Sequence, residues 1–562
     1  MFENQYKIFA KYLIQNFRIK IIQIFLLSVF ETLLEIFSIV VLIAALSILF
    51  TQGSSDNWFA SFVLKFEYDF NNKLDLFYLI ILVYVLKNLI LALIQWVKLD
   101  LCGKIFKELS QSTYQALLKK NSLFFNNFSS GDLAQNVISE SEFTKGVIIS
   151  FVGLFTELLI IITMFFLIAS QNIYAAFITL IFLTISSYVY YFFMKQKNLS
   201  FGEKRQFFSI KIMNLLFHSL AHHKLIILSD KIKFFIKKFS NNISVIYKVA
   251  RDQMVIQYSS RLWLECCILL ILVFTISPLV ETEDVSSSKI SDILLISIIS
   301  LRFVPSFSNI LGSYSTIQYG SKAVSNIMNI LKKEKTTPTY QIEKIVFNQL
   351  ILENISFKYE NNNETLIKNF NHNIKNNSLV GVKGENGSGK STILRIISGL
   401  IEPDNGRVLM DKQSIYDDQA VNYNWKKNIG YADQKLVFSN ETILKTIAFG
   451  EEEKNIDEQF VADCLKKLDL LDFFMKMPNK LNTFIGENGK NLSGGQLQKL
   501  NIARALYLNP KILIFDEVTN NLDTKSQEKF VELINSYKKN CLIVIATHLE
   551  KVLSYCDNII EL

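Results

Sequence analysis

The sequence predicts two folds in one chain: an α-helical membrane domain with six transmembrane helices, followed by an α/β domain. Half of the 562 residues are hydrophobic and 46 are phenylalanine, which is unusual for a soluble protein of this length. The apolar residues gather in long runs within the first 331 positions. A glycine-rich motif that binds phosphate stands at 384–392, between an apolar strand and an apolar helix.

Six apolar segments are long enough to cross a bilayer, which needs about 20 residues in a helix. They span 21–50, 76–97, 147–169, 173–194, 263–280 and 290–311. The first is too long for the apolar part of a secretory signal, and no A-x-A-like cleavage site follows it. Residues 1–20 mix aromatic side chains with Lys7, Lys11, Arg18 and Lys20, which predicts a helix lying at the membrane surface.

Positive charge in the connecting segments predicts the orientation of these helices. Six lysines lie between the second and third segments, and 195–261 holds thirteen Lys and Arg residues against three acidic ones. The remaining connections carry few basic residues. Basic loops stay in the cytoplasm, so we expect a multi-pass protein of the inner (cytoplasmic) membrane with both termini and the α/β domain in the cytoplasm. The net charge of +8 is modest, and we expect no nucleic-acid partner.

Several ionisable residues stand inside the apolar segments, where a charge is costly. Two interpretations remain open. The charges can pair with one another: Arg261 and Glu265 are four residues apart, and Lys87 can meet Glu31 or Glu35 of the first segment. Alternatively, the basic residues line a polar cavity and hold an anionic head group. Under the second interpretation the candidate substrate-binding residues are Lys87, Arg261 and Arg302.

The motif at 384–392 fits G-x-x-x-x-G-K-[ST], in which glycines let successive backbone N–H groups turn toward a phosphate. Lys390 can reach the β- and γ-phosphates, and the Ser391 hydroxyl can bind Mg²⁺. The predicted ATP-binding residues here are Gly384, Asn386, Gly387, Ser388, Gly389, Lys390, Ser391 and Thr392.

Further motifs follow in a fixed order. Gln434 comes after the apolar strand 429–432, and the strand 511–515 ends in Asp516 and Glu517. His548 follows the strand 541–546. Between them stands the motif Leu492, Ser493, Gly494, Gly495 and Gln496. With these motifs, the segment from residue 345 onward resembles the ATP-binding cassette (ABC) family.

The resemblance implies roles for these residues, with ATP and Mg²⁺ as the bound groups. Tyr359 would stack on adenine. Ser391, Gln434 and Asp516 would hold Mg²⁺, Glu517 would act as the general base, and His548 would contact the γ-phosphate. Residues 492–496 would contact the ATP of a second chain, so the resemblance also implies a symmetric homodimer. Departures from the family pattern are Lys499, the stretch Asn520-Asn521-Leu522-Asp523, and Leu549 after His548.

Six spans before a cassette resemble an exporter-type half-transporter of the type IV fold. This resemblance divides the chain into a transmembrane domain at 1–331, a linker at 332–344 and a cassette at 345–562. It also implies two coupling regions, at 125–142 and 220–239.

Three weaker patterns, at 31–49, 58–66 and 301–306, resemble lipid-linked oligosaccharide flippases of the PglK type. They imply an amphipathic cargo that contacts the lipid bilayer, a lipid-linked oligosaccharide or similar glycolipid. The alternative is export of a peptide, such as a bacteriocin, or of another amphipathic small molecule. A regulatory cassette that is merely tethered to the membrane is disfavoured, because an anchor needs only one span.

Overall fold

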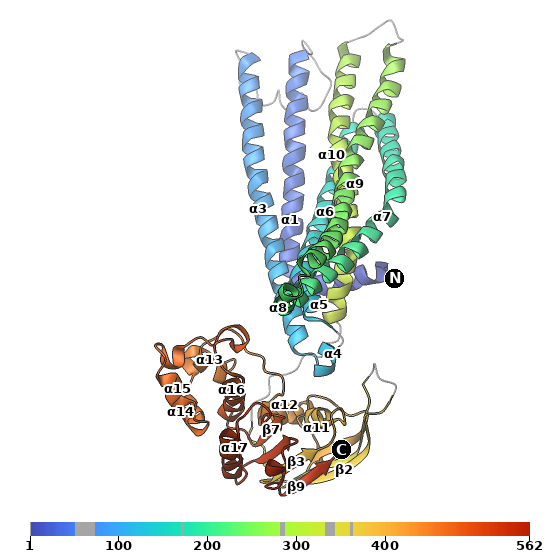
Figure 1. Ribbon diagram of the computed structural model, residues 1–562. Coiled ribbons are helices and arrows are strands. Elements are labelled where there is room, and N and C mark those ends of the chain that lie inside the picture. Colours follow the sequence, from blue (N-terminus) through green and yellow to red (C-terminus); the bar gives the residue numbers. More distant parts are fainter. Residues whose placement is uncertain are drawn as a thin grey trace. The chain divides into compact units, whose positions relative to one another are not determined.

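The computed structural model describes residues 2–50, 73–126, 128–169, 173–280, 287–331, 343–359 and 364–562 (Figure 1). These residues group into two compact units. The first comprises Met1–Lys120 and Phe125–Glu334, and the second comprises Asn121–Phe124 and Lys335–Leu562. Most of the predicted linker and all of the predicted amphipathic loop at 58–66 lie outside the described residues.

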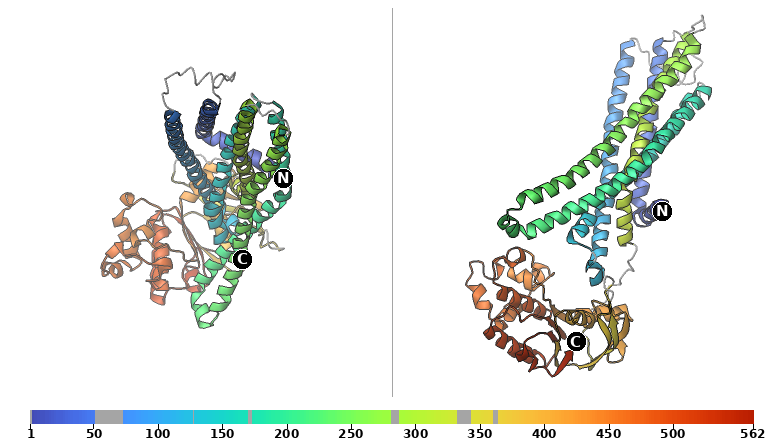
Figure 2. Two further views of the ribbon diagram at one scale, coloured as in Figure 1. Left: turned by 90° about the horizontal axis from the view of Figure 1, so that it is seen from above. Right: turned by 45° about the vertical axis from the view of Figure 1, so that its right-hand side comes forward.

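Six long helices build the described part of the first unit, and each contains one of the predicted spans. They are α1 (Phe2–Phe50), α3 (Lys73–Leu118), α6 (Ser141–Ala169), α7 (Ile173–Ala221), α9 (Ile232–Val280) and α10 (Ser287–Leu331). Within the described residues, four stretches are long and apolar enough to cross a membrane: Gln5–Val41, Ile80–Leu118, Ser130–Ala169 and Ala176–Ala221. Helices α7 and α9 run side by side far beyond their apolar parts and are joined by the short α8 (His223–Leu228), as Figure 2 shows.

The N-terminal part of α1 is bent away from the rest of that helix. Phe17 has non-helical backbone angles, and the helix continues on both sides of it. The hydroxyl of Tyr6 donates a hydrogen bond of 2.6 Å to the carbonyl of Ile317 on α10. Phe9, Leu13 and Phe17 recur at helical spacing and are buried among α3, α6 and α10. This apolar stripe fixes the predicted surface helix to the other helices of its unit.

The connection between α3 and α6 contains three short helices, where the first coupling region is predicted: α4 (Ser122–Asn126), α5 (Ser130–Gln135) and the π-helix η1 (Asn136–Glu140). Helix α5 starts at a capping box, in which Ser129 and Asp132 bond to each other's backbone N–H groups. The π-helix ends at Glu140, which is fully buried against Arg205 of α7. Single π-turns within helices are often found at functional positions.

Two sheets form the core of the second unit, as far as the structure describes it. A parallel sheet has the order β6 (Ile429–Ala432), β7 (Ile512–Asp516), β8 (Leu542–Ala546), β3 (Leu379–Lys383) and β9 (Asn558–Glu561). An antiparallel sheet has the order β2 (Ile367–Lys375), β1 (Gln349–Phe357), β4 (Asn405–Met410) and β5 (Gln413–Ser414). Strands β7 and β8 are buried along their whole length and consist of apolar residues up to Asp516, as expected for central parallel strands.

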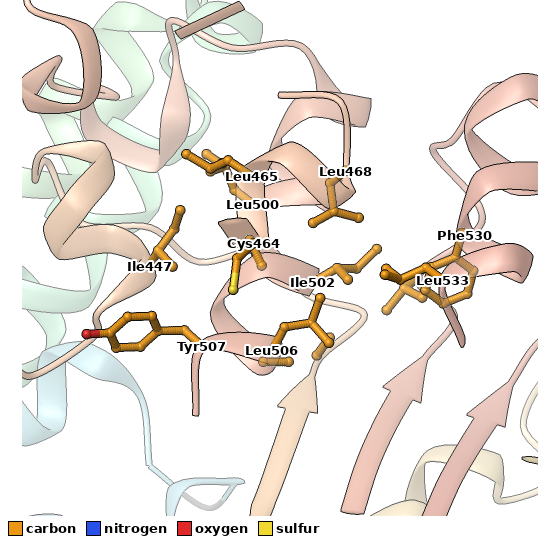
Figure 3. Close-up of a cluster of buried hydrophobic side chains, with 14 of the residues drawn as sticks. Ile447, Cys464, Leu465, Leu468, Leu500, Ile502, Leu506, Tyr507, Phe530 and Leu533 are labelled. Atoms are coloured by element: carbon orange, nitrogen blue, oxygen red, sulfur yellow. The ribbon is translucent and has the colours of Figure 1, made fainter. Parts of the chain in front are cut away.

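The described part of the second unit also contains helices. They are α11 (Lys390–Ile397), α12 (Gln419–Lys427), α13 (Ile443–Ile447), α14 (Glu458–Lys467), α15 (Leu471–Met475), α16 (Gly494–Tyr507), α17 (Thr524–Tyr537) and α18 (Glu550–Leu553). Three one-turn 3-10 helices lie at Glu453–Asn455, Lys480–Asn482 and Glu487–Gly489. Figure 3 shows how α16 is held: its Leu500, Ile502 and Leu506 pack against side chains of α13, α14 and α17. These three side chains are at most 1% exposed, and burying each contributes about 1.5–3 kcal/mol.

Candidate nucleotide-binding and catalytic site

The predicted catalytic residues all follow the carboxyl ends of four adjacent parallel strands. Gln434 follows β6, Glu517 follows β7, His548 follows β8, and the glycine-rich loop follows β3. The register pairs Asp516 with Ala546 and Val382 with Ala546, so the ends of β7, β8 and β3 are level. Ligand sites of open α/β sheets form at this edge. The fold thus brings together residues that are up to 164 positions apart in the sequence, from 384 to 548.

The glycine-rich loop adopts a backbone that only glycine accepts readily. Gly387 and Gly389 have φ of 87° and 106°, in the left-handed region. Gly389 is the residue before the first turn of α11, so the free N–H groups of that helix lie directly after the loop. Lys390 Nζ donates to the carbonyls of Gly384 and Glu385, at 2.9 and 3.1 Å. This arrangement combines a positive helix end with a lysine, which suits the phosphates of a nucleotide.

Ser391 and Asp516 form the predicted metal-binding pair. Ser391 Oγ donates to Asp516 Oδ1 at 3.1 Å, and Tyr431 donates to the other carboxylate oxygen at 3.5 Å. Burial raises the pKa of the Asp516 carboxyl above its ordinary value, and nearby Asp433 and Glu517 act in the same direction. A cation at this carboxylate would relieve that electrostatic cost.

Glu517 is at the centre of the cluster. Its backbone has a φ of 52°, which is uncommon for a residue other than glycine and is often found at functional sites. Gln434 Nε2 donates to Glu517 Oε2 at 2.6 Å. His548 Nε2 is 3.4 Å from Glu517 Oε1 and 2.9 Å from Lys390 Nζ. The carboxylate is therefore held by two neighbouring strand ends, with one oxygen facing the lysine and the histidine.

Asn520 is a residue of this site that the sequence did not single out. Its Nδ2 donates to Glu517 Oε2 at 3.1 Å, beside the bond from Gln434. The stretch 520–523 resembles the D-loop of the ABC family and departs from its usual sequence, but that resemblance assigns Asn520 no contact with Glu517. Its position three residues after Glu517, in the turn before α17, was the signal available for this contact.

The residues at these four strand ends fit Mg²⁺ and a nucleoside triphosphate. The side chains of Ser391, Asp516 and Gln434 offer hydroxyl, carboxylate and amide oxygens, the hard donors that Mg²⁺ prefers. Ser388 Oγ is buried in the loop and has no hydrogen-bond partner among the described residues, which leaves it able to donate to a phosphate. No group of three or more His, Cys, Asp or Glu side chains that could hold a metal occurs in the described part of the chain. Mg²⁺ is usually bound by one or two carboxylates together with substrate phosphates, and Asp516 supplies one buried carboxylate here.

Tyr359, the predicted adenine contact, lies at the end of the antiparallel sheet near the loop. Its hydroxyl is 3.0 Å from Thr392 Oγ1, and its ring meets Phe357 edge-on at a centroid distance of 5.0 Å. The hydroxyl of Tyr359 is thus hydrogen-bonded to the first turn of α11. The described contacts place this aromatic ring beside the phosphate-binding residues.

The motif 492–496 caps and starts helix α16. Ser493 caps the helix: its hydroxyl accepts the N–H of Gln496, whose side chain bonds back to the N–H of Ser493. Ser493 and Gly494 are exposed. A Cβ added to Gly494 would meet no atom within 4 Å, whereas one added to Gly495 would lie 3.0 Å from the carbonyl of Asn521. The helix end therefore presents free N–H groups and an open surface.

Two of the three candidate substrate-binding residues are engaged within the chain. Lys87 Nζ is 3.4 Å from Glu35 Oε2 and 4.8 Å from the ring centroid of Tyr84. Arg261 Nε bonds to Glu265 Oε1 at 2.8 Å. The pairing interpretation of these charges thus has direct geometric support. Arg302 lies on α10, and its side chain is outside the described residues.

Comparison with known proteins supports the cassette assignment. A model of the family "ABC transporter" matches residues 367–520. A second model, "AAA domain, putative AbiEii toxin, Type IV TA system", matches residues 488–554. The chain is 30% identical over 292 residues to an ATP-dependent lipid A-core flippase of Haemophilus influenzae (strain 86-028NP), covering 52% of this chain and 49% of that protein.

Other relatives have different names. The chain is 31% identical over 248 residues to a multidrug resistance-like ATP-binding protein, MdlB, of Buchnera aphidicola, covering 44% of this chain and 42% of that protein. The chain thus spans about half the length, or less, of the curated relatives it matches.

A solved structure extends the similarity to nearly the whole chain. The structure of a bacterial Atm1-family ABC exporter with ATP bound covers 98% of this chain and 93% of its own chain, with a TM-score of 0.79 and 17% identity. This likeness shows the fold. The chain therefore carries the ATP-binding domain of an ABC transporter, fused to an α-helical membrane domain with the fold of an ABC exporter.

Proposed function

We propose that the chain hydrolyses ATP and uses the free energy to export an amphipathic molecule across the inner membrane. The observation that carries this proposal is the cluster at four strand ends, in which Glu517 is bonded by Gln434 and Asn520 and faces Lys390 and His548. This arrangement suits transfer of a phosphoryl group to water, which depends on positioning and charge neutralisation.

Each group in the cluster has a distinct task. Glu517 accepts a proton from the attacking water, and the bonds from Gln434 and Asn520 fix the direction of its carboxylate. Lys390 and the N–H groups that begin α11 stabilise the negative charge of the phosphates. His548, 2.9 Å from Lys390, contributes a further donor on the side of the γ-phosphate. When bound, Mg²⁺ neutralises phosphate charge, and Ser391, Asp516 and Gln434 would hold it.

The proposed site needs a second copy of the chain. The 492–496 motif presents a capped helix end with free N–H groups, the feature that binds a phosphate, yet it belongs to a different part of the cassette from the Glu517 cluster. In a symmetric homodimer each of these helix ends would close the ATP site of the partner. A two-fold arrangement gives two equivalent sites.

The substitution Gly494→Ala tests this pairing. A new methyl group meets nothing within 4 Å in the single chain, and alanine favours a helix over glycine, so unfolding stability should not fall. ATPase activity should fall at least tenfold, because the methyl group stands where the partner's nucleotide would approach. Gly103→Ala on α3, which also meets no atom within 4 Å, is the matched control. Wild-type turnover by the Gly494→Ala variant would show that this surface does not touch ATP.

For the cargo we propose a lipid-linked oligosaccharide or a similar glycolipid. Support comes from the exporter fold and from the similarity to proteins named lipid A-core flippase. The test is ATPase activity of the full-length chain in vesicles with and without added glycolipid, combined with a labelled-lipid flipping assay. Stimulation and flipping by glycolipid, but not by plain phospholipid, are expected. Stimulation by a cationic peptide alone would instead support the alternative, peptide export.

The paired charges of α1 and α3 refine this proposal. Lys87 and Lys98 bond to Glu35 and Glu31, so an anionic head group could use these lysines only by displacing a carboxylate. Replacing Lys87 by Met should therefore alter helix packing more than it alters glycolipid stimulation. If Lys87→Met abolishes stimulation while the variant unfolds at the wild-type temperature, Lys87 contacts the cargo.

A further inference from the structure

The bend at Phe17 encloses an apolar cavity that the proposed transport reaction does not use. The cavity has a volume of about 260 Å³ and is lined by α1 on both sides of the bend, together with α3 and α6. Every lining side chain is apolar; Leu13, Ile24, Ile105 and Phe155 are examples. Water gains no hydrogen bonds in such a cavity, so hydrocarbon is the occupant that fits.

The cavity opens at the surface of the membrane domain. Among the lining residues, Ile14 is 54% exposed, and Phe25 and Phe151 are each 41% exposed. The opening lies where the mixed segment 1–20 meets the first apolar span, which is the expected level of the lipid head groups on the cytoplasmic side. A chain of hydrocarbon can therefore enter from the adjacent leaflet.

Basic residues lie on α1 on both sides of the bend. Lys7 and Lys11 are one turn apart, and Ile14 continues the same face of the helix. Arg18 is the first residue after the bend. Lys7, Lys11 and Arg18 are exposed, and neither Lys11 nor Arg18 forms an ion pair within the described part of the chain. Lys20, by contrast, is already paired with Glu108.

We propose that this bend binds one anionic phospholipid of the cytoplasmic leaflet. An acyl chain fills the cavity, and the phosphate meets the basic face formed by Lys7, Lys11 and Arg18. The apolar cavity alone would bind the acyl chain of any phospholipid. The positive charge beside the opening adds a preference for an anionic head group, worth about a fivefold change in affinity for each charge at low salt. The site is independent of the exported cargo and of the ATPase reaction.

The experiment titrates the full-length chain in neutral detergent with phosphatidylglycerol or phosphatidylcholine of equal chain length, and counts bound lipids by native mass spectrometry. Wild type should retain phosphatidylglycerol more tightly. The triple variant Lys7→Gln, Lys11→Gln, Arg18→Gln should lose about 100-fold in affinity for phosphatidylglycerol and change little for phosphatidylcholine. Ala10→Phe, which places a ring in the lining of the cavity, should weaken both lipids.

A matched control separates this site from general attraction to positive charge. Lys233, Lys237 and Lys238 are exposed on α9, outside the cavity lining, and replacing all three by Gln removes the same charge. This control should keep the wild-type preference. Equal retention of the two lipids by wild type, an equal loss in the control, or displacement by soluble glycerol phosphate would each overturn the proposal.

Discussion

The membrane domain and the cassette both bury ionisable side chains, but they satisfy them differently. In the membrane domain, Glu140 and Arg205 are 0% and 2% exposed and form two parallel bonds of 3.0 and 3.2 Å. The guanidinium carbon is 3.5 Å from the ring centroid of Phe143. In the cassette, the side chains of Lys390 and Glu517 are 5% and 12% exposed and lie 3.8 Å apart, and the exposed His548 is 3.4 Å from Glu517.

The same cost of burying charge therefore has two outcomes. A bidentate pair with short bonds ties the π-helix η1 to α7, and each of its charges already has a partner. A network with shared and longer contacts holds catalytic groups in place, and phosphate and metal can replace these contacts without leaving a charge unpaired. We therefore expect the Glu140–Arg205 pair to hold its two helices rigidly together, and the network of Lys390, Glu517 and His548 to take part in catalysis.

The largest expected effect comes from removing the charge of Glu517. Glu517→Gln keeps the bonds from Gln434 or Asn520 possible but cannot accept a proton from water, so ATP hydrolysis should fall by about 10²–10⁴-fold. Nucleotide binding, measured with a fluorescent ATP analogue, should persist. Glu528→Gln, which removes an exposed carboxylate paired with Lys551, is the control and should hydrolyse ATP at close to the wild-type rate. Unimpaired hydrolysis by Glu517→Gln would contradict the general-base assignment.

The buried pair provides the second prediction. Glu140→Gln leaves Arg205 buried without its counter-ion and should lower the free energy of unfolding by about 3–5 kcal/mol. The double variant Glu140→Gln, Arg205→Met should recover most of that loss, because no charge remains buried. Thermal unfolding in detergent measures both. Asp100→Asn at the exposed pair with Lys104 should change stability by less than about 1 kcal/mol, and an equal loss there would remove the contrast between buried and exposed pairs.

A smaller effect is expected from acid. Because burial raises the pKa of Asp516, this carboxyl takes up a proton at a higher pH than an ordinary aspartate. As pH falls through the raised pKa, protonation relieves the burial cost and favours the folded cassette, but it removes the carboxylate that Mg²⁺ needs. Mn²⁺ binding followed by electron paramagnetic resonance should therefore weaken on acidification sooner than an unburied aspartate would allow. Asp516→Asn should bind weakly at every pH, and an unchanged pH profile in that variant would assign the effect to another group.

Motifs with local physical causes were predictable from the sequence. Gly387 and Gly389 are needed for positive φ, and the apolar strand before them places the loop at a sheet edge. The capping role of Ser493 follows from Gln496 three residues later. The six long helices were predictable because each carries an apolar run of sufficient length. The strands predicted at 429–432, 511–515 and 541–546 end within one residue of β6, β7 and β8, whereas the antiparallel sheet and β9 were not predicted.

Side-chain partners between distant segments were not predictable in this way. The sequence left two interpretations of Lys87, and only the packing of α1 against α3 brings it to Glu35 rather than to open space. Asn520 looked like a departure from a pattern until the turn after β7 placed its amide on Glu517. No proline or glycine stands at the bend at Phe17, so the sequence did not predict a kink there.

The sequence by itself determined where the helices, strands and phosphate loop lie, because hydrophobic period, glycine backbone freedom and helix capping act over a few neighbouring residues. Only the tertiary structure decided which charges neutralise one another and which remain available to a ligand. Those choices depend on the distance between groups that lie 52 to 158 residues apart in the chain, such as Glu35 with Lys87 and Lys390 with His548. Electrostatic energy depends on that distance and on burial, and neither quantity can be predicted from residues that are neighbours in the sequence.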